Sequence, residues 1–290
     1  MHLLILGAGF SGRAIAEAFK AEGFKVTGTT RSPEKARQMA SLGIEALVYD
    51  GENIDEDLRA AMRSATHLVQ SIAPGPAGDP LMRPGMPALA TMMRQLDWVG
   101  YLSTVGVYGD HGGAWVNEET ACRPVSQRSR ERVAAEEAWM ATGNALDRPV
   151  AILRLAGIYG PGRNSFMNFQ AGTARRLVKP GQVFNRIRVE DIADSTLFLA
   201  VRRLGGIYNV TDDEPAPPQD VVEEAARLMG IAPPPEIAFE TAELSPMARS
   251  FYGENKRVSN QRLKQAGYRF RFPTYRQSLA DLWESGRWRG

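Results

Sequence analysis

A short apolar run that leads directly into three spaced glycines places the strongest constraint on the fold of this chain. Residues 3–6 read LLIL and predict a strand buried on both faces. Gly7, Gly9 and Gly12 follow in the spacing G-x-G-x-x-G, and apolar residues recur at helical spacing over 15–19. A strand, a glycine-rich turn and a helix in this order are typical of the phosphate-binding turn in dinucleotide-binding folds.

Each glycine has a separate predicted task. Gly7 permits the tight turn that ends the strand, Gly9 lets the backbone approach a pyrophosphate, and Gly12 lets the helix pack closely on the strand. The helix N-terminus offers N–H groups and the positive end of its dipole to an anion. We therefore predict a dinucleotide site at this turn, with Phe10 and Ser11 included; a glycine-rich loop without a ligand is the alternative.

The end of the next strand, KVTGTT over 25–30, bears on which dinucleotide would bind. An NAD-preferring unit usually carries an acidic residue about twenty residues past the glycines, where it accepts a hydrogen bond from the ribose 2′-hydroxyl. Here that place holds Thr30, followed by Arg31 and Ser32. Arg31 offers a fork of donors to a 2′-phosphate, and Ser32 adds a hydroxyl. The sequence predicts NADP in preference to NAD, unless Arg31 is merely a solvated loop residue.

Strand and helix patterns alternate over the first half of the chain. Further strands are predicted at 44–49, 67–72, 98–103 and 150–155, helices at 34–42, 58–63 and 88–96, and a loop rich in proline and glycine at 74–87. This alternation predicts an α/β fold of the Rossmann type, a doubly wound parallel sheet with helices on both faces.

Ligands of such sheets bind at the carboxyl ends of the strands, so the residues at those ends are candidates for the cofactor site. Asp50 follows the third predicted strand, where it can reach an adenine amino group or cap the next turn. Ser71, Ile72 and Ala73 end the fourth strand with small residues and a turn, as backbone beneath a dinucleotide should.

The C-terminal part of the chain gives weaker signals. Helices are predicted at 220–229, 259–265 and 275–285, and a short strand within 233–240. Trp283 and Trp288 are not spaced for one helix face, so we predict that each packs separately.

Composition limits the partners and surroundings of the protein. The 290 residues carry a formal net charge of +2, and no run of lysine or arginine suggests a nucleic-acid partner. No apolar run is long enough to cross a bilayer and no leader pattern precedes the glycines, so a cytoplasmic protein that does not bind membranes is expected. Cys122 is the single cysteine, which excludes an intrachain disulfide. No cluster has metal-ligand spacing, so no metal is expected.

Four phrases further along the chain carry a more specific signal. They are YLSTVGVYGD at 101–110, LRLAGIYGPGR at 153–163, NRIRVEDIADS at 185–195 and GGIYNVTDDEP at 205–215. With the glycine turn, they resemble the extended short-chain dehydrogenase/reductase superfamily, the NAD(P)-dependent epimerases and dehydratases. The resemblance implies an NAD(P)-binding Rossmann domain over 1–163, to which 185–210 return, and a small C-terminal α/β cap domain for the substrate over 164–184 and 211–290. It also implies a homodimer.

In this superfamily catalysis uses a Ser or Thr hydroxyl that holds the substrate oxygen, and a Tyr and a Lys spaced Y-x-x-x-K on one helix face. The resemblance places Thr104 at the hydroxyl position, with Ser103 as the alternative. The Tyr and Lys positions fall on Arg128 and Arg132, in a helix expected to begin shortly after Pro124. The two arginines keep the four-residue spacing of the Tyr and Lys but cannot perform the same chemistry. Arg128 cannot lose its proton near neutral pH and so cannot act as a general base.

Arg128 and Arg132 have several alternative roles. Arg132 can hold ribose hydroxyls, and two guanidinium groups one helical turn apart favour a carboxylate or a phosphate. They could instead bridge to Glu118, Glu119 or Glu136.

Two tyrosines are further candidates for moving a proton. Tyr108, in the VYG phrase, is predicted to line the substrate pocket or to pack beneath its loop. Tyr159, in GIYGPG, is predicted to face the pocket or to anchor a turn. A Y-x-x-x-K does occur at Tyr252 and Lys256, in the C-terminal part, where we interpret it as a chance match.

Two functions are compatible with this pattern. The first is an NADP-dependent oxidoreductase or epimerase that acts on a small polar substrate, sugar-like or anionic, without the standard Tyr and Lys. The second is an NADP-binding protein without turnover, a sensor or a partner-binding module. A group that can move a proton beside the nicotinamide would separate the two.

Overall fold

A computed structural model describes residues 1–83 and 89–290 of the chain. These residues form two compact units, which are described separately below. The first comprises Met1–Val107, Pro124–Arg154 and Ile192–Tyr208, and the second comprises Tyr108–Arg123, Leu155–Asp191 and Asn209–Gly290. Because packing alone defines these units, the limits of the cofactor and substrate domains stay a prediction. The end of the predicted loop at 74–87 and the first residue of the predicted helix at 88–96 lie outside the described residues.

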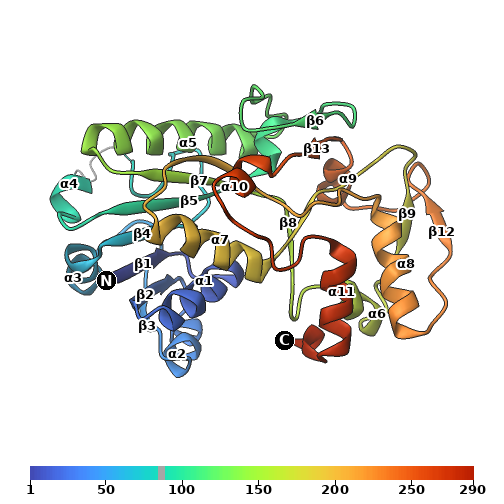
Figure 1. Cartoon of the computed structure of the whole chain (residues 1–290), viewed down its shortest axis with the longest axis horizontal. Coiled ribbons are helices and arrows are strands. Elements are labelled where there is room, and N and C mark those ends of the chain that lie inside the picture. Colours follow the sequence, from blue (N-terminus) through green and yellow to red (C-terminus); the bar gives the residue numbers. More distant parts are fainter. Residues whose placement is uncertain (84–88) are drawn as a thin grey trace. The chain divides into compact units, whose positions relative to one another are not determined.

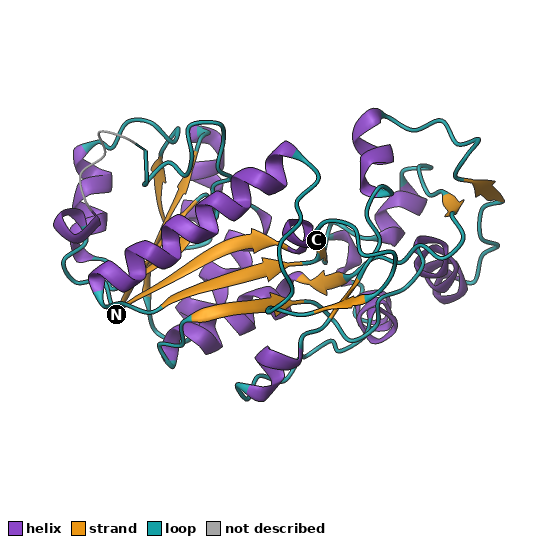
Figure 2. Ribbon diagram, turned by 90° about the horizontal axis from the view of Figure 1, so that it is seen from above, coloured by secondary structure: helices purple, strands orange, loops and turns teal. Residues whose placement is uncertain are grey.

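A seven-stranded parallel sheet, most of it in the first unit, confirms the predicted fold class (Figure 2). Its strands are β1 (His2–Leu6), β2 (Lys25–Thr30), β3 (Glu45–Val48), β4 (His67–Gln70), β5 (Trp98–Thr104), β7 (Val150–Leu155) and β11 (Gly206–Val210). Their order across the sheet is β11-β7-β5-β4-β1-β2-β3, so the chain starts in the middle, winds to one edge and then to the other. This reversal between β1 and β4 is the topological switch point at which doubly wound folds bind their ligands.

Helices cover both faces of this sheet (Figure 1). They are α1 (Phe10–Ala21), α2 (Pro33–Ser41), α3 (Glu56–Ser64), α4 (Leu89–Met92), α5 (Gln127–Leu146) and α7 (Val189–Val201). Apolar residues of α3, α4 and α5 share one core with Leu4, Leu6 and Val99 of the strands. On the other face, α1 packs against Ile5, where α2 and α7 also lie.

Two helix predictions can be compared in detail with the structure. The helix expected soon after Pro124 begins at Gln127, because the Ser126 hydroxyl accepts the backbone N–H of Ser129 and caps it. The helix predicted at 88–96 is shorter than expected. It stops at Met92 because the chain then turns into β5.

The second unit is built from short elements. They are β6 (Trp115–Val116), β8 (Gly157–Tyr159), α6 (Ser165–Gln170), β9 (Arg176–Val178), β10 (Arg186–Arg188), α8 (Pro218–Met229), β12 (Glu236–Ala238), α9 (Pro246–Phe251), β13 (Arg257–Val258), α10 (Gln261–Gln265), α11 (Tyr275–Glu284) and the 3₁₀ turn η2 (Arg287–Arg289), while a further 3₁₀ turn, η1 (Val105–Tyr108), joins it to β5. The strands form the parallel pairs β8–β10, β9–β12 and β6–β13.

The apolar core of the second unit lies among α6, α8 and α11. The rings of Trp283 and Trp288 stack there, with centroids 5.8 Å apart. The prediction that they pack separately is wrong, because α11 ends before Gly286, whose φ of +70° turns Trp288 back onto the helix.

Over residues 1–83 and 89–290, no helix combines the length and the apolar composition that crossing a membrane requires.

Candidate functional site

The three glycines of the first turn occupy three different environments. Gly7 has a φ of +85°, and a Cβ on it would lie 2.9 Å from Cγ1 of Ile72. A Cβ on Gly12 would lie 3.1 Å from the carbonyl oxygen of Gly7 and 3.3 Å from Cγ2 of Ile5. A Cβ on Gly9 would meet no described atom within 4 Å. These are the environments expected of a turn residue, a packing residue and a residue that leaves room for a ligand.

Helix α1 begins at this turn, and no acidic side chain of its first turn offsets the positive end of its dipole. Gly9 is its N-cap residue, and within the described chain no side chain caps the helix and no acidic residue lies in its first turn. The turn is fixed by Thr29 of β2, whose carbonyl oxygen accepts the N–H of Ala8 at 2.7 Å and whose Oγ1 accepts the N–H of Gly7 at 2.9 Å. The first N–H groups of α1 can therefore be donated to an anion without a competing carboxylate.

Arg31 follows directly after β2. It is exposed, and its guanidinium forms no hydrogen bond or ion pair with another residue in the described ranges. Ser32 caps α2, because its Oγ accepts the backbone N–H of Lys35 at 3.4 Å, and its hydroxyl hydrogen stays available. Thr30 Oγ1 accepts the N–H of Ser32 at 3.5 Å. The strand end thus presents donors and carries no carboxylate.

Asp50 takes the second of its two predicted roles. Its Oδ1 accepts the backbone N–H groups of Glu52 at 2.8 Å and Asn53 at 3.1 Å, and these bonds lower the pKa of the exposed carboxyl. Asp50 therefore caps the turn after β3, and a role in binding adenine stays a prediction.

Ser71 and Ile72 lie beside the glycine turn, and the role of Ser71–Ala73 beneath a dinucleotide stays a prediction. Ser71 donates its N–H to the carbonyl oxygen of Leu6 at 2.9 Å, and Ile72 donates its N–H to Oε1 of Gln70 at 3.0 Å. The side chain of Ile72 lies against Gly7.

A buried network that the sequence did not predict supports this passage. Asp79, only 1% exposed, accepts hydrogen bonds at Oδ1 from Nε2 of Gln70 and the N–H of Leu81, both at 2.9 Å, and at Oδ2 from Nε1 of Trp139 at 3.2 Å. Burial raises the pKa of Asp79. A carboxylate in a loop rich in proline and glycine was the only local signal, since Trp139 is distant in the sequence.

The two hydroxyls at the end of β5 differ. Ser103 is buried, and its hydroxyl donates to Oε1 of Glu136. Thr104 is half-buried, and its Oγ1 accepts the N–H of Gly106 at 3.1 Å, which leaves its hydrogen for another acceptor. Thr104 is therefore the better candidate to bind a substrate oxygen.

Ser129, beside Arg128 in the sequence, adds a hydroxyl that was not predicted. Its Oγ would lie 3.1 Å from a Cβ on Gly106, and Oγ1 of Thr104 would lie 3.4 Å from the same point. The end of β5 and the start of α5 therefore approach each other at these hydroxyls. The available signal was the S-x-x-S spacing of Ser126 and Ser129 just before a helix.

Arg128 and Arg132 both lie on α5 in different surroundings. Arg128 is exposed and forms no hydrogen bond or ion pair with another described residue. Arg132 is half-buried, and its Nη1 donates to the carbonyl oxygen of Leu102 at 2.5 Å and to the hydroxyl of Tyr101 at 3.4 Å. Arg132 therefore ties α5 to β5.

None of the three carboxylates considered as partners binds these arginines in the described chain. Glu136 pairs with Arg154, Glu119 pairs with Arg262, and Glu118 accepts the N–H of Asn209.

Tyr108, a candidate for proton transfer, has a packing role in the second unit. Tyr252 and Lys256, the chance match to Y-x-x-x-K, have packing roles there as well. Tyr108 is fully buried and donates its hydroxyl to Oδ1 of Asn209 at 2.7 Å, which is the packing alternative. Tyr252 packs between other aromatic rings, and Nζ of Lys256 donates to the carbonyl oxygen of Gly109 at 2.7 Å.

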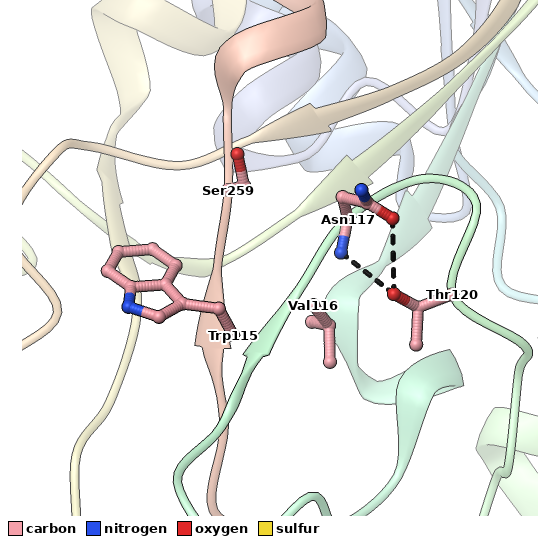
Figure 3. Close-up of a pocket in the computed structure, with 5 residues that line it drawn as sticks. All are labelled: Trp115, Val116, Asn117, Thr120 and Ser259. Atoms are coloured by element: carbon pink, nitrogen blue, oxygen red, sulfur yellow. Dashed lines mark hydrogen bonds between the residues drawn. The ribbon is translucent and has the colours of Figure 1, made fainter.

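Two hollows open on the second unit beside Trp115, which is 60% exposed. The larger, of about 310 Å³, is lined by Trp115, Val116, Asn117, Thr120 and Ser259 (Figure 3). Asn117 and Thr120 hydrogen-bond to each other in its wall. The smaller, of about 110 Å³, includes Asp212 and Lys264. Within the described ranges, no group of three or more His, Cys, Asp or Glu residues is placed to hold a metal ion.

Comparison with known proteins agrees with this fold. The model of the "NAD dependent epimerase/dehydratase family" matches residues 84–210. Protein YeeZ of Escherichia coli (strain K12) is 32% identical over 242 residues, 79% of this chain and 84% of YeeZ. A solved structure of a functionally unknown conserved protein from Silicibacter pomeroyi DSS is 45% identical, with 98% of this chain and 99% of that chain covered and a TM-score of 0.88. The chain belongs to the NAD-dependent epimerase/dehydratase family of the extended short-chain dehydrogenase/reductase superfamily, which confirms the resemblance.

More distant structures share the fold alone. The dTDP-glucose 4,6-dehydratase of Bacillus anthracis str. Ames, solved in complex with NAD, is 17% identical, with 98% of this chain and 96% of that chain covered and a TM-score of 0.78. The human epimerase family protein SDR39U1, solved with NADPH, is 17% identical, with 98% and 99% covered and a TM-score of 0.72.

Proposed function

We propose that this chain binds NADP(H) and uses it as an oxidoreductase or epimerase on a small polar substrate. The start of α1 is the main observation that supports a cofactor site. There the positive end of the helix dipole has no acidic neighbour in the first turn, and Gly9 leaves open space. A pyrophosphate would accept the N–H groups of α1 there. Arg31, exposed at the end of the neighbouring strand, would bind a 2′-phosphate.

The relatives support a nicotinamide dinucleotide and leave the choice between the two forms to this chain's own residues. SDR39U1 was solved with NADPH and the dTDP-glucose dehydratase with NAD. The choice of NADP rests on Arg31 and on the lack of a carboxylate after β2.

The bound cofactor would give or take a hydride. Thr104 would donate its free hydroxyl hydrogen to the substrate carbonyl oxygen, since its oxygen is already an acceptor for Gly106. Arg128, which stays protonated, would stabilise the negative charge that develops on that oxygen. Water would supply the proton, because a guanidinium cannot release one at neutral pH. Arg132 would position α5 through its bond to Leu102.

A second candidate function is cofactor binding without turnover. It is favoured by the absence of a Tyr and a Lys from the expected places on α5 and by the engagement of Tyr108 with Asn209. A protein with this function would sense NADP(H) or bind a partner.

The test has a binding part and a turnover part. NADPH fluorescence is titrated with the wild type and with Gly9→Val, and we expect binding to the wild type and a loss of at least about tenfold in the variant. NADPH consumption is then followed with 2-oxo acids, aldoses and keto-sugars, and turnover should be lost in Thr104→Val. Equal NADPH binding by Gly9→Val would overturn the site. Binding without consumption of NADPH for any of these carbonyl compounds would contradict the enzymatic function and favour the second candidate.

A further inference from the structure

Buried polar atoms without partners gather around Arg186 in the second unit. In the β8–β10 pair, Arg186 lies opposite Gly157 and Arg188 lies opposite Tyr159. Side chains two residues apart on a strand share a face, so both arginines and Tyr159 lie on the same side of this pair. Gly157 contributes no side chain to this face, and a Cβ on it would lie 3.1 Å from the carbonyl oxygen of Asn185.

Two further elements complete this surrounding. Asp212, which follows β11 in the chain, donates its N–H to the carbonyl oxygen of Arg186 at 2.8 Å and so lies beside β10. Helix α11 contributes Tyr275, whose ring centroid lies 5.9 Å from the guanidinium of Arg186. Ser278 of the same helix lies beside the Tyr159 hydroxyl without hydrogen-bond geometry, and its own hydroxyl accepts from Nη1 of Arg188 at 3.0 Å.

Three polar atoms in this group are buried and have no hydrogen-bond partner in the described chain. They are the hydroxyl oxygens of Tyr159 and Tyr275 and Oδ2 of Asp212. Tyr275 is fully buried and Asp212 is 1% exposed. Buried polar atoms are nearly always hydrogen-bonded, so three in one group indicate a missing partner.

The charges of the group show what kind of partner fits. Arg188 and Arg176 are each paired with two carboxylates. Arg186 instead donates from Nη1 to two backbone carbonyls and forms no ion pair with another described residue. The hydroxyls of Tyr159 and Tyr275 can each donate a hydrogen bond, and burial raises the pKa of Asp212 well above its usual range. The group therefore offers hydrogen-bond donors and an unpaired positive charge.

We propose that Arg186, Tyr159 and Tyr275 bind an oxyanion, the carboxylate or phosphate of the substrate. An oxyanion fits because it accepts hydrogen bonds at several oxygens at once and a guanidinium binds it strongly. The assignment of this anion to the substrate rests on the proposed function, whereas anion binding itself needs no cofactor.

Titration calorimetry on the full chain at constant ionic strength tests the proposal, with inorganic phosphate and malonate as probes. We expect at least one probe to bind, and the stronger one identifies the source as a phosphate or a carboxylate. Tyr159→Phe and Tyr275→Phe should each weaken it about tenfold. Tyr252→Phe, a tyrosine packed among rings of the same unit, is the matched control and should leave the affinity unchanged.

Thermal unfolding separates a ligand site from a structural water site. If the hydroxyls serve a ligand, both Tyr→Phe variants melt at the same temperature as the wild type or higher without anion, and lose the rise that the anion causes. Failure of both probes to bind, equal binding by the variants, or lower melting of both variants without anion would overturn the proposal. NADPH binding by the wild type is measured in parallel; its loss with anion binding kept would refute only the proposed function.

Discussion

Arg154 donates from Nη2 to Oε2 of Glu136 over 2.7 Å, and both side chains are almost completely buried. Glu136 also accepts the hydroxyl of Ser103, so one carboxylate joins β5, α5 and β7 behind the candidate site. Removing one partner of a buried ion pair leaves the other charge uncompensated.

Glu136→Ala should therefore destabilise the protein by about 3–5 kcal/mol, measured by urea unfolding. Glu137→Ala, at the exposed neighbouring position of α5, should change the free energy of unfolding by less than about 0.5 kcal/mol. Similar values for the two variants would show that the buried pair does not hold these elements together.

Alanine substitutions at two glycines of the first turn should separate binding from stability. Gly9→Ala should leave the free energy of unfolding nearly unchanged, because its Cβ meets no described atom, and should weaken NADPH binding. Gly12→Ala should destabilise by about 1 kcal/mol or more, because its Cβ would crowd the carbonyl oxygen of Gly7. Urea unfolding and NADPH titration of both variants provide the check; a destabilised Gly9→Ala that binds NADPH normally would speak against the assignment.

Restoring the standard pair should raise turnover. Arg128→Tyr combined with Arg132→Lys keeps the spacing on α5 and supplies a phenol that can transfer a proton beside a cation that lowers its pKa. We expect the rate of NADPH consumption to rise at least about tenfold, the lower range for general acid–base catalysis. Arg130→Tyr, an exposed change on the same helix, is the control. An unchanged rate in the double variant would mean that α5 does not present these positions to the substrate.

Asp212 should make stability depend on pH. Burial raises its pKa in the folded protein above the value in the unfolded chain, so the folded state holds a proton that the unfolded state loses. The contribution of Asp212 to the free energy of unfolding is therefore fully present below the pKa of the unfolded chain. It is lost as the pH rises through the pKa of the folded protein. Asp212→Asn should gain stability relative to the wild type as the pH rises, in urea unfolding from pH 4 to pH 8. Parallel curves for the two proteins would exclude this role.

Much of the first unit follows from its sequence because strands and helices alternate there, and strands such as β1 are apolar runs that end at glycines. The glycine turn was equally readable, since Gly7, Gly9 and Gly12 act through local geometry. The position of Arg31 was readable as well, because it directly follows a predicted strand, whereas its role in binding NADP stays a prediction.

Partners distant in the sequence explain what could not be predicted. Tyr108 is engaged by Asn209, which lies 101 residues away, and Ser103 by Glu136, 33 residues away. No local pattern contains these pairings. The short strands of the second unit pair across similar distances, so the group around Arg186 became visible only in three dimensions.

The central claim, that Arg31 selects NADP at the site built by the glycine turn, is tested most directly by the ratio of the dissociation constants for NADH and NADPH. In the wild type we expect this ratio to exceed about ten, the effect of one charge-assisted contact to a phosphate. In Arg31→Ala the ratio should fall toward one, with NADH affinity unchanged, while Arg37→Ala, exposed further along α2, should keep the wild-type ratio. A wild-type ratio near one, or a ratio that Arg31→Ala leaves unchanged, would contradict the claim.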